Sequence, residues 1–460
     1  MWEALYNLTG FLWGTPLMIL MVGVGLYLTI RSGFFQILHL PTWWKHTIGE
    51  VFKKNSNENA GEGELKPYQA LSTVLAGTVG SGNIAGVAAA IAIGGPGAVF
   101  WMWIIAIVGM MTKMTEVTLA VAYRKKSPSG EYYGGPMHYM KSGLGKLGPV
   151  LAGIYAVALF IDVLTDACFV QTNTLASCVK DVFNVPMILC GIIVVGISII
   201  VILSGGIKVI GDFCGKIVPP MIIIYIIGCL VVICSNASAI PHAFGMIFQY
   251  AFSPAPAVGG FAGSTISLSM ARGASRGIFS NEAGMGTATT VHATAQTDNP
   301  AHQGMYGILE VFIDTIIICT LTSLTVLCSG VWSCGDSGVV LTFDAFRSTW
   351  GQIGIIILCI AVVLFTYSSY IGFFVEFRTC VEFLFSEKSV KYLQWLFFAL
   401  PILSVTLEVE QIWDLADMAV GFIVIPNMIA LLLLSPKFLE IFKGYTAKLK
   451  AKNKPEADEQ

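Results

Sequence analysis

The sequence predicts an all-α membrane protein with eleven transmembrane helices, in which the last ten form a 5+5 inverted repeat with two broken helices. The 460 residues are 55% apolar and only 12% charged, whereas an ordinary soluble domain is about 25% charged. The apolar residues come in blocks of about 20, which are long enough to cross a hydrocarbon core of about 30 Å. Two of these blocks contain runs of glycine or proline, which weaken a helix where a membrane span is normally most regular.

The same composition excludes several other classes of protein. A soluble enzyme or a disordered scaffold would need far more polar surface, and an outer-membrane barrel would show short alternating segments. The net charge of −2 provides no basic field for nucleic acid. We find no nucleophile–base pair and no Walker motif, and the six histidines show no metal-ligand spacing. We therefore expect a protein that works in the lipid bilayer and is not an enzyme.

Apolar blocks mark eleven candidate spans along the chain. They lie at 11–30, 70–93, 97–122, 149–177, 187–204, 215–234, 241–271, 304–331, 353–374, 392–407 and 412–435. The first span and the interfacial segment after it make up residues 1–67. Residues 68–236 and 237–436 hold five spans each, and residues 437–460 form a lysine-rich cytoplasmic tail that we expect to be solvated and mobile.

The basic residues orient these spans. With the N-terminus outside, the 26 Lys and Arg residues fall almost entirely on the inner side. Only Lys180 and Arg347 fall outside, and Lys113 lies within a span. Because cytoplasmic loops are enriched in Lys and Arg, this distribution predicts a multi-pass protein of the cell membrane with an outer N-terminus and a cytoplasmic C-terminus.

Two of the spans carry sequence that interrupts a helix. The first contains four glycines between Gly77 and Gly86, and each costs about 1 kcal/mol relative to alanine in a helix interior. The second interruption is expected at 253–264, where Pro254 and Pro256 remove backbone donors. Either motif alone also suits close helix packing. Unwound backbone at membrane depth is tolerated only against protein or a watery cavity.

Taken together, the two interruptions predict a secondary transporter. Each lies in the first helix of a five-helix set, and an odd number of helices inverts one set relative to the other. Interrupted helices at corresponding positions of inverted repeats build the midplane site of such transporters. The free N–H groups of an unwound helix suit a carboxylate. Its free C=O groups and nearby hydroxyls suit Na⁺, a hard cation that prefers oxygen.

Long blocks of sequence around these interruptions resemble the alanine-or-glycine:cation symporter family of bacteria and archaea. The blocks lie at 78–87, 94–98, 100–103, 259–263, 276–286, 303–304 and 309–315. The resemblance covers nearly all of the membrane region. It implies a leucine-transporter-type fold and the uptake of a small neutral amino acid, alanine or glycine, driven by Na⁺ or, in some members, by H⁺.

The resemblance also implies which residues bind the substrate and the ion. Substrate contacts would come from both interruptions, a pocket glutamine and a phenylalanine wall in the ninth span. These residues are Thr78, Gly80, Ser81, Gly82, Asn83, Gln171, Phe261, Gly263, Ser264 and Phe373. The implied Na⁺ ligands are two carbonyls of the first interruption and two hydroxyls of the ninth span, from Ala76, Val79, Ser368 and Ser369. Thr78 and Asn83 match a second ion position found in some relatives.

Two departures from the family pattern leave the substrate open. Family members often carry Trp where this chain has Phe373, and the fourth span has Asp162 and Asp166 where small residues are expected. A larger neutral amino acid such as glutamine therefore remains an alternative. An ion channel and a membrane enzyme or sensor remain alternatives in other classes, and the oligomeric state is open.

The remaining polar residues of the spans are expected to serve structure or gating. On a regular helix Gln171 would lie about 140° from Asp166, so we expect the acids of this span to face away from the pocket. Lys113 and Glu116 are three positions apart and are expected to pair with each other, while Glu310 and Asp314 repeat the i, i+4 spacing of Asp162 and Asp166; structural pairing is the expected role of both sets.

The polar segment 272–303 suggests a moving part beside the second interruption. We favour a cytoplasmic gate on Arg276 or Glu282, because loops that adjoin a broken helix must move. Asp417 begins the last span and is expected near water.

Overall fold

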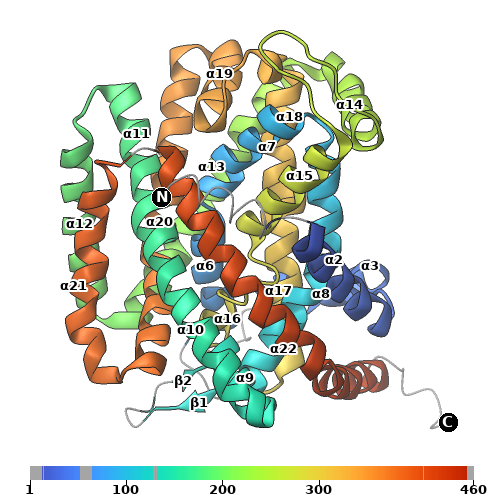
Figure 1. The fold of residues 1–460 in the computed structure, drawn as a ribbon, viewed down its shortest axis with the longest axis vertical. Coiled ribbons are helices and arrows are strands. Elements are labelled where there is room, and N and C mark those ends of the chain that lie inside the picture. Colours follow the sequence, from blue (N-terminus) through green and yellow to red (C-terminus); the bar gives the residue numbers. More distant parts are fainter. Residues whose placement is uncertain are drawn as a thin grey trace, which may run out of the picture.

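The computed structural model describes residues 13, 15–51, 65–127, 130, 132–407 and 409–452, and nearly all of them are helical. The longer helices pack as an upright bundle (Figure 1). Helices of eight or more residues are α2 (Thr15–Arg31), α6 (Pro67–Thr78), α7 (Val87–Gly94), α8 (Ala98–Ala122), α9 (Pro136–Gly143), α10 (Gly148–Thr165), α11 (Thr172–Phe183), α12 (Met187–Leu203), α13 (Gly206–Ser235), α14 (Ile240–Phe252), α15 (Ile266–Asn281), α17 (Pro300–Val311), α18 (Thr320–Cys328), α19 (Gly338–Trp350), α20 (Gln352–Leu384), α21 (Glu387–Ser404) and α22 (Val409–Lys452). Shorter helices are α3 (Phe35–Leu38), α4 (Leu40–Lys45), α5 (Ile48–Val51), α16 (Thr289–His292), and the 3₁₀ turns η2 (Gly145–Leu147), η4 (Ala237–Ala239) and η6 (Val331–Ser333). The strands β1 (Lys125–Lys126) and β2 (Tyr132–Tyr133) pair as an antiparallel hairpin at one end of the bundle.

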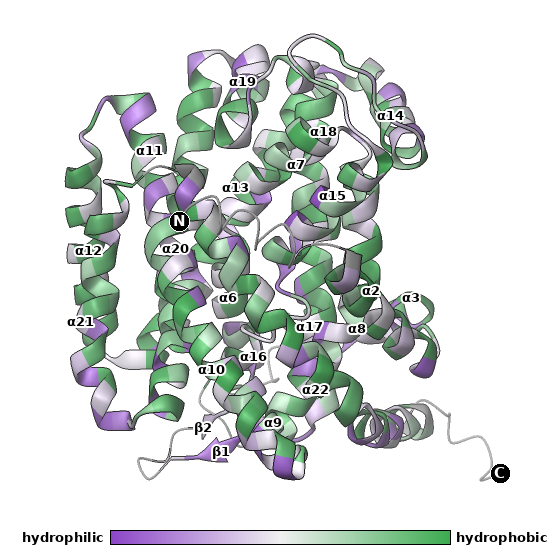
Figure 2. Ribbon diagram, in the orientation of Figure 1, coloured by the Kyte–Doolittle hydropathy of each residue, from purple (hydrophilic) through white to green (hydrophobic). Residues whose placement is uncertain are grey.

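Several helices of the described chain are long and apolar enough to cross a membrane. They are Ala98–Ala122, Gly145–Phe183, Gly206–Ser235, Pro300–Cys328, Gln352–Leu384 and Gln411–Leu449, and a bent pair adds a seventh candidate. Much of the ribbon of these helices is coloured as hydrophobic (Figure 2). Among the exposed apolar residues, Ile154, Ile200 and Ile223 are each more than half exposed. Apolar surface of this extent fits contact with lipid. The count of eleven spans, the inverted repeat and its division at residue 236 stay predictions.

The first broken helix lies where the sequence predicted it. Helix α6 ends at Thr78, and a π-helical turn that begins at Gly82 leads into α7. The two halves are bent by 52°. Residues 79–81 between them are buried, as unwound backbone inside a membrane requires.

The second break lies elsewhere than predicted. Residues 253–265 form a largely exposed, irregular segment between α14 and α15, because its prolines end α14 rather than interrupt a span. The chain instead unwinds at 282–288, between α15 and α16, where Glu282, Gly284 and Gly286 adopt φ angles of 53°, 102° and 78°. Glycine reaches positive φ without steric cost, so the two glycines specify this break.

Three π-helical stretches interrupt the α-helices of the bundle. They are η1 (Gly82–Gly86), η3 (Asp166–Gln171) and η5 (Phe312–Cys319). π-turns are rare and occur often at functional sites. Asn83 of η1 donates to Asp314 of η5, and Ser81, next to η1, donates to Gln171 of η3. The three irregular stretches therefore meet in the interior.

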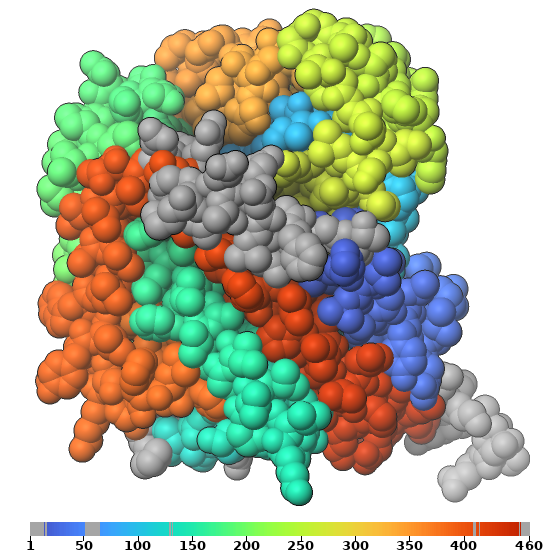
Figure 3. All heavy atoms as spheres, viewed as in Figure 1, coloured from blue at the N-terminus to red at the C-terminus, as the bar shows by residue number. Residues whose placement is uncertain are grey.

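The C-terminal segment is more regular than predicted. Helix α22 continues past Pro436 to Lys452, so the expected mobile tail is wrong as far as residue 452, and residues 453–460 lie outside the described chain. In the space-filling view α22 crosses the face of the molecule beside α10 (Figure 3).

Candidate functional site

The first break holds two backbone amides against polar side chains. The Gly80 N–H donates to Asn83 Oδ1 at 2.9 Å, and the Ser81 N–H donates to Gln171 Oε1 at 3.2 Å. Ser81 Oγ is buried and has no hydrogen-bond partner among the described residues. A buried polar group without a partner is uncommon and calls for an explanation such as a bound ligand. The structure thus brings together four of the residues that the resemblance implied.

Two glycines allow other helices to close on this break. A Cβ at Gly80 would lie 2.6 Å from Ser369 Oγ and 2.9 Å from Gln171 Oε1. A Cβ at Gly82 would lie 3.1 Å from Phe279 Cδ1. Helices α20 and α15 and the π-turn η3 therefore approach the break so closely that larger residues at these positions would need the neighbours to shift.

An oxygen-rich position lies where α20 meets the end of α6. Ser369 Oγ donates to the Ala76 carbonyl at 2.7 Å and lies 3.5 Å from the Val79 carbonyl. Ser368 Oγ instead contacts Met221 Sδ of α13 at 3.4 Å. The structure therefore brings together three of the four implied Na⁺ ligands, while the hydroxyl of Ser368 points toward α13.

A second oxygen-rich cluster surrounds Asp314 of η5. Its carboxylate accepts hydrogen bonds from Asn83 Nδ2 at 2.5 Å and from Ser280 Oγ and Thr315 Oγ1 at 2.8 Å each. Asn281 Nδ2 donates to Thr315 Oγ1 at 3.0 Å. All five side chains are buried. A carboxylate with hydroxyl and amide oxygens is the donor set that hard cations prefer.

A π-turn changes which side chains of η3 face the site. Gln171 Nε2 donates to Asp166 Oδ1 at 2.8 Å. Because a π-turn closes its hydrogen bonds between residues i and i+5, residues five apart come to the same side. The prediction that Asp166 faces away from Gln171 is therefore wrong. Asp162 is fully buried, and its carboxylate oxygens have no partner among the described residues.

Side chains from three helices hold the second break in place. Glu116 Oε1 accepts from the Gly284 N–H at 3.0 Å and from Asn427 Nδ2 at 2.6 Å. Asn427 Nδ2 also donates to the Gly284 carbonyl at 2.8 Å, and Tyr155 Oη donates to the Met285 carbonyl at 2.8 Å. The backbone groups that unwinding releases are thus paired, as buried backbone groups must be.

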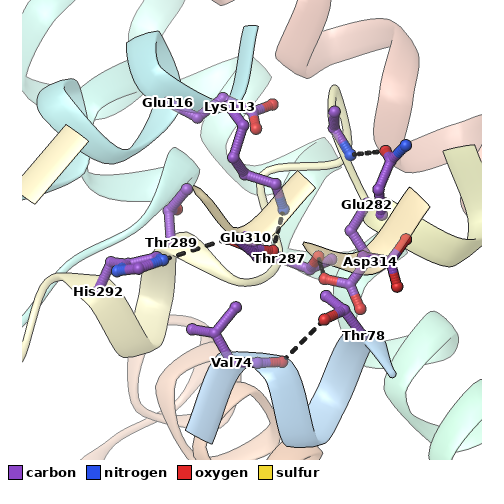
Figure 4. Close-up of polar contacts among 12 residues, drawn as sticks. Val74, Thr78, Lys113, Glu116, Glu282, Thr287, Thr289, His292, Glu310 and Asp314 are labelled. Atoms are coloured by element: carbon purple, nitrogen blue, oxygen red, sulfur yellow. Dashed lines mark hydrogen bonds and ion pairs between the residues drawn. The ribbon is translucent and has the colours of Figure 1, made fainter. Parts of the chain in front are cut away.

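A buried charge cluster lies beside this break (Figure 4). Lys113 Nζ is 2.9 Å from Glu310 Oε1, and His292 Nε2 is 3.2 Å from Glu310 Oε2, with all three side chains fully buried. Lys113 therefore pairs with Glu310 and not with Glu116, so the predicted partner is wrong, while the structural pairing role predicted for Lys113 and Glu310 is confirmed. Helical spacing decides only which residues share a face, whereas the packing of α8 against α17 and α16 decides which opposite charges meet.

An ion pair between α15 and α22 lies beside the first break, where a Cβ at Gly86 would be 3.7 Å from Arg276 Cδ. Arg276 of α15 donates twice to the carboxylate of Asp417 in α22, at 2.9 and 3.0 Å, and lies 4.8 Å from the Trp413 ring centroid. Phe279 packs on Trp413 with centroids 5.0 Å apart. Asp417 is buried, so the expectation that it lies near water is wrong. Arg276 is therefore held in a buried ion pair between α15 and α22, and a gate role for Arg276 stays a prediction. Glu282 accepts a hydrogen bond from Thr287 within the second break.

Three predicted substrate residues lie away from the first break. Ser264 Oγ donates to the carbonyl of Gly94, the last residue of α7, at 2.8 Å. Gly94 is twelve residues beyond Gly82, about 18 Å along a helix. Phe261 and Gly263 belong to the same loop as Ser264. The structure therefore corrects their placement, because the loop that carries them covers the far end of α7.

The two other predicted substrate residues are buried near the break. Thr78 Oγ1 donates to the Val74 carbonyl of its own helix at 3.2 Å (Figure 4). Phe373 lies one turn beyond Ser369 on α20 and is fully buried. The preceding residue, Gly372, lets α20 pack on α6, because a Cβ there would lie 3.2 Å from the α6 backbone.

Sequence reasoning did not place five polar residues in this region. It gave other roles to Glu116, Asp166 and Asp314, and it did not single out Ser280 and Asn281. Their signal was present, because polar side chains inside a span usually face the protein interior and mark function. Their partners were not accessible, since contacts such as Asn83 to Asp314 join residues 231 positions apart.

Comparisons with known proteins identify the family of the chain. A sequence model of the sodium:alanine symporter family matches residues 1–459. The chain is 37% identical over 458 residues to the sodium/alanine symporter AgcS of Methanococcus maripaludis, covering 97% of this chain and 98% of that protein. It is 38% identical over 444 residues to an uncharacterized transporter of Haemophilus influenzae, covering 96% and 95%. It is 34% identical over 446 residues to the probable sodium/glutamine symporter GlnT of Bacillus subtilis, covering 96% and 90%.

A solved structure shares the fold. The crystal structure of MhsT in complex with L-phenylalanine matches with a TM-score of 0.56 at 15% identity, covering 81% of this chain and 89% of that one. At this identity the likeness concerns the fold alone.

Proposed function

Because this chain belongs to the sodium:alanine symporter family, we propose that it couples Na⁺ influx to the uptake of alanine or glycine by alternating access. It is a membrane transporter, since its family and fold are those of transporters and not of enzymes or channels. The observation that carries the substrate proposal is the enclosed first break. There Gly80 and Ser81 face Gln171 and Ser369 in the core.

In this proposal the substrate carboxylate lies at the start of the helix formed by η1 and α7. A helix N-terminus offers free N–H groups and positive potential to an anion. The unpartnered hydroxyl of Ser81 is a further donor for the carboxylate. Asp166 and Gln171, which are bonded to each other beside the break, supply acceptors for the ammonium group. A zwitterionic amino acid can therefore place its carboxylate at the helix start and its ammonium group at Asp166 and Gln171.

The close packing around the break favours a small side chain. Phe279 lies against Gly82, and Phe373 is buried one turn from Ser369. Alanine and glycine need little further space. Glutamine is the second candidate substrate, because the relative GlnT carries the name of a probable sodium/glutamine symporter.

The coupling Na⁺ is proposed at the Ala76 and Val79 carbonyls and the Ser369 hydroxyl, whose oxygen lies 2.7 Å from the Ala76 carbonyl and 3.5 Å from the Val79 carbonyl. The buried Asp314 carboxylate among hydroxyls supports a second ion position. An ion at the first position would tie α20 to α6 and organise the adjoining amides. By linkage, the amino acid would then raise Na⁺ affinity as much as Na⁺ raises amino-acid affinity. H⁺ is the alternative coupling ion.

Alternating access requires that the two sides of the site open in turn. We propose that the Arg276–Asp417 pair with Phe279 and Trp413 closes the outer side, with the N-terminus outside and the C-terminus in the cytoplasm. Each Na⁺ that enters at a membrane potential of 100 mV would contribute about 2.3 kcal/mol to uphill uptake.

Uptake into proteoliposomes tests this function. Purified protein would be reconstituted, and the accumulation of radiolabelled alanine, glycine and glutamine would be measured with an inward Na⁺ gradient, with equal Na⁺ on both sides and with an H⁺ gradient alone. We expect accumulation of alanine or glycine above equilibrium only with the Na⁺ gradient. Accumulation driven by an H⁺ gradient alone would show that H⁺ is the coupling ion instead of Na⁺. A preference for glutamine would show that glutamine is the substrate instead of alanine or glycine. Uptake of none of the three would contradict the proposal.

A further inference from the structure

Two histidines and a glutamate from distant parts of the chain meet outside the transport site. His46 follows α4 and Glu50 belongs to α5, while His302 lies in the first turn of α17. One ligand atom from each of the three side chains can be chosen so that all three atoms lie within 4.8 Å of one another. This cluster could not be predicted from spacing along the chain, because His46 and His302 are 256 positions apart.

The distances among these side chains suit a metal ion. Glu50 Oε1 lies 3.5 Å from His46 Nδ1, and Glu50 Oε2 lies 3.1 Å from His302 Nε2. In a tetrahedral site with Zn–N and Zn–O bonds of about 2.0–2.1 Å, neighbouring ligand atoms are about 3.3–3.4 Å apart. The two observed separations, each to a different oxygen of the same carboxylate, are close to this length, so Glu50 reaches both imidazoles at once.

The local structure also prepares the ligands. His46 and Glu50 are four positions apart across the turn that joins α4 to α5, and this turn brings their side chains together. All three side chains are about a quarter exposed or less, which leaves an entry for an ion. His302 Nε2 is also 3.1 Å from the carbonyl oxygen of His46, so a backbone oxygen adjoins the three side chains.

We propose that His46, Glu50 and His302 form a binding site for a divalent transition metal, Zn²⁺ in particular. Two imidazoles and one carboxylate are the ligand set of many zinc sites that keep a fourth position open for water. The ion would replace the direct contacts of Glu50 with the histidines. It would fasten α4 and α5 to α17, which continues into η5 and the Asp314 cluster. Binding of the metal does not depend on the proposed transport function.

A competing metal cluster has to be removed before the site is tested. Ligand atoms of Cys334, Asp336 and Asp344 also lie within 4.8 Å of one another, and Cys334 is exposed. Cys234 is exposed as well. The parent for the experiment is therefore the full chain with C234S and C334S, in which thiol binding of zinc at these surface positions is absent.

Zn²⁺ titration of the purified parent by isothermal calorimetry tests the proposal. We expect one Zn²⁺ per chain. We expect E50Q and H302Q each to weaken binding at least about 100-fold, because the loss of even an outer-shell partner commonly costs about 10–100-fold. H242Q removes an exposed histidine of α14 and should bind like the parent. The visible spectrum of Co²⁺ in the same protein should show tetrahedral coordination that is lost in H46Q.

The thermal midpoint separates loss of the site from loss of the fold. Without metal, the variants should keep a gel-filtration profile and a thermal midpoint near those of the parent, and only the parent and H242Q should gain stability with Zn²⁺. The proposal is overturned if the parent binds no Zn²⁺ below about 100 µM. It is equally overturned if folded E50Q and H302Q bind Zn²⁺ as tightly as the parent.

Discussion

Replacing Gly80 by alanine should weaken both Na⁺ and amino-acid binding. The added Cβ would lie 2.6 Å from Ser369 Oγ and 2.9 Å from Gln171 Oε1, so both side chains must move. Movement of Ser369 breaks its hydrogen bond to the Ala76 carbonyl, and movement of Gln171 breaks its hydrogen bond to the Ser81 N–H. Each bond contributes about 0.5–1.5 kcal/mol. The combined loss is about 1–3 kcal/mol, or roughly 5- to 150-fold in affinity.

The assay is alanine uptake into proteoliposomes, measured as a function of Na⁺ and of alanine. We expect the half-saturating Na⁺ concentration and the KM for alanine to rise together, because Na⁺ and substrate binding are linked. Gly77→Ala provides the matched control. It adds the same methyl group in the same broken helix, where nothing lies within 4 Å of the new Cβ.

The comparison refutes the reasoning in two ways. If Gly80→Ala keeps the parent's Na⁺ dependence and KM, the break does not bind the transported species. If Gly77→Ala loses as much as Gly80→Ala, the defect comes from the helix and not from the contacts of Gly80.

Three further changes test separate parts of the account. Ser369→Ala removes one proposed Na⁺ ligand, which contributes about 1–2 kcal/mol, and should raise the half-saturating Na⁺ concentration for uptake roughly 5- to 30-fold. Ser368→Ala is the control and should change that concentration little. Equal effects of the two substitutions would contradict the proposed ion position. Arg276→Gln and Asp417→Asn should each lower the free energy of unfolding by about 3–5 kcal/mol, because each leaves a buried charge unpaired. In thermal unfolding, the double variant should lose less stability than the sum of the two single losses. Additive losses would contradict the pairing of Arg276 with Asp417. Burial beside Lys125 and Lys141 lowers the pKa of His138 in α9 to about 4. The folded protein therefore favours the neutral form of His138. The free energy of unfolding should fall by about 3 kcal/mol as the pH drops from about 6.5 to 4. His138→Phe should flatten this acid loss of thermal stability, and an unchanged profile would show that His138 is not responsible.

The membrane class and the first break could be predicted because both are local properties of the sequence. The glycines between Gly77 and Gly86 weaken the helix wherever it packs. The prediction placed the second break at the wrong residues because Pro254 and Pro256 disfavour a helix more strongly than Gly284 does. Whether such residues interrupt a span or end a helix beside it depends on depth in the bundle, which one sequence does not contain.

Partners across the bundle could not be predicted for the same reason. The prediction for Asp166 assumed a regular helix, and the π-turn at η3 brings it to Gln171. Lys113 was paired with a neighbour three residues away, whereas α17 brings Glu310 to it. Side chains inside a span signal that they are important, but tertiary packing decides what they meet.

The proposed role of the first break is tested most directly by an experimental structure determined with alanine and Na⁺. The account predicts density for the amino acid between the amides of Ser81 and Gly82 and the side chain of Gln171, and an ion among the oxygens of Ala76, Val79 and Ser369. Amino-acid density lodged away from this break, or an uninterrupted helix through residues 77–86, would contradict it.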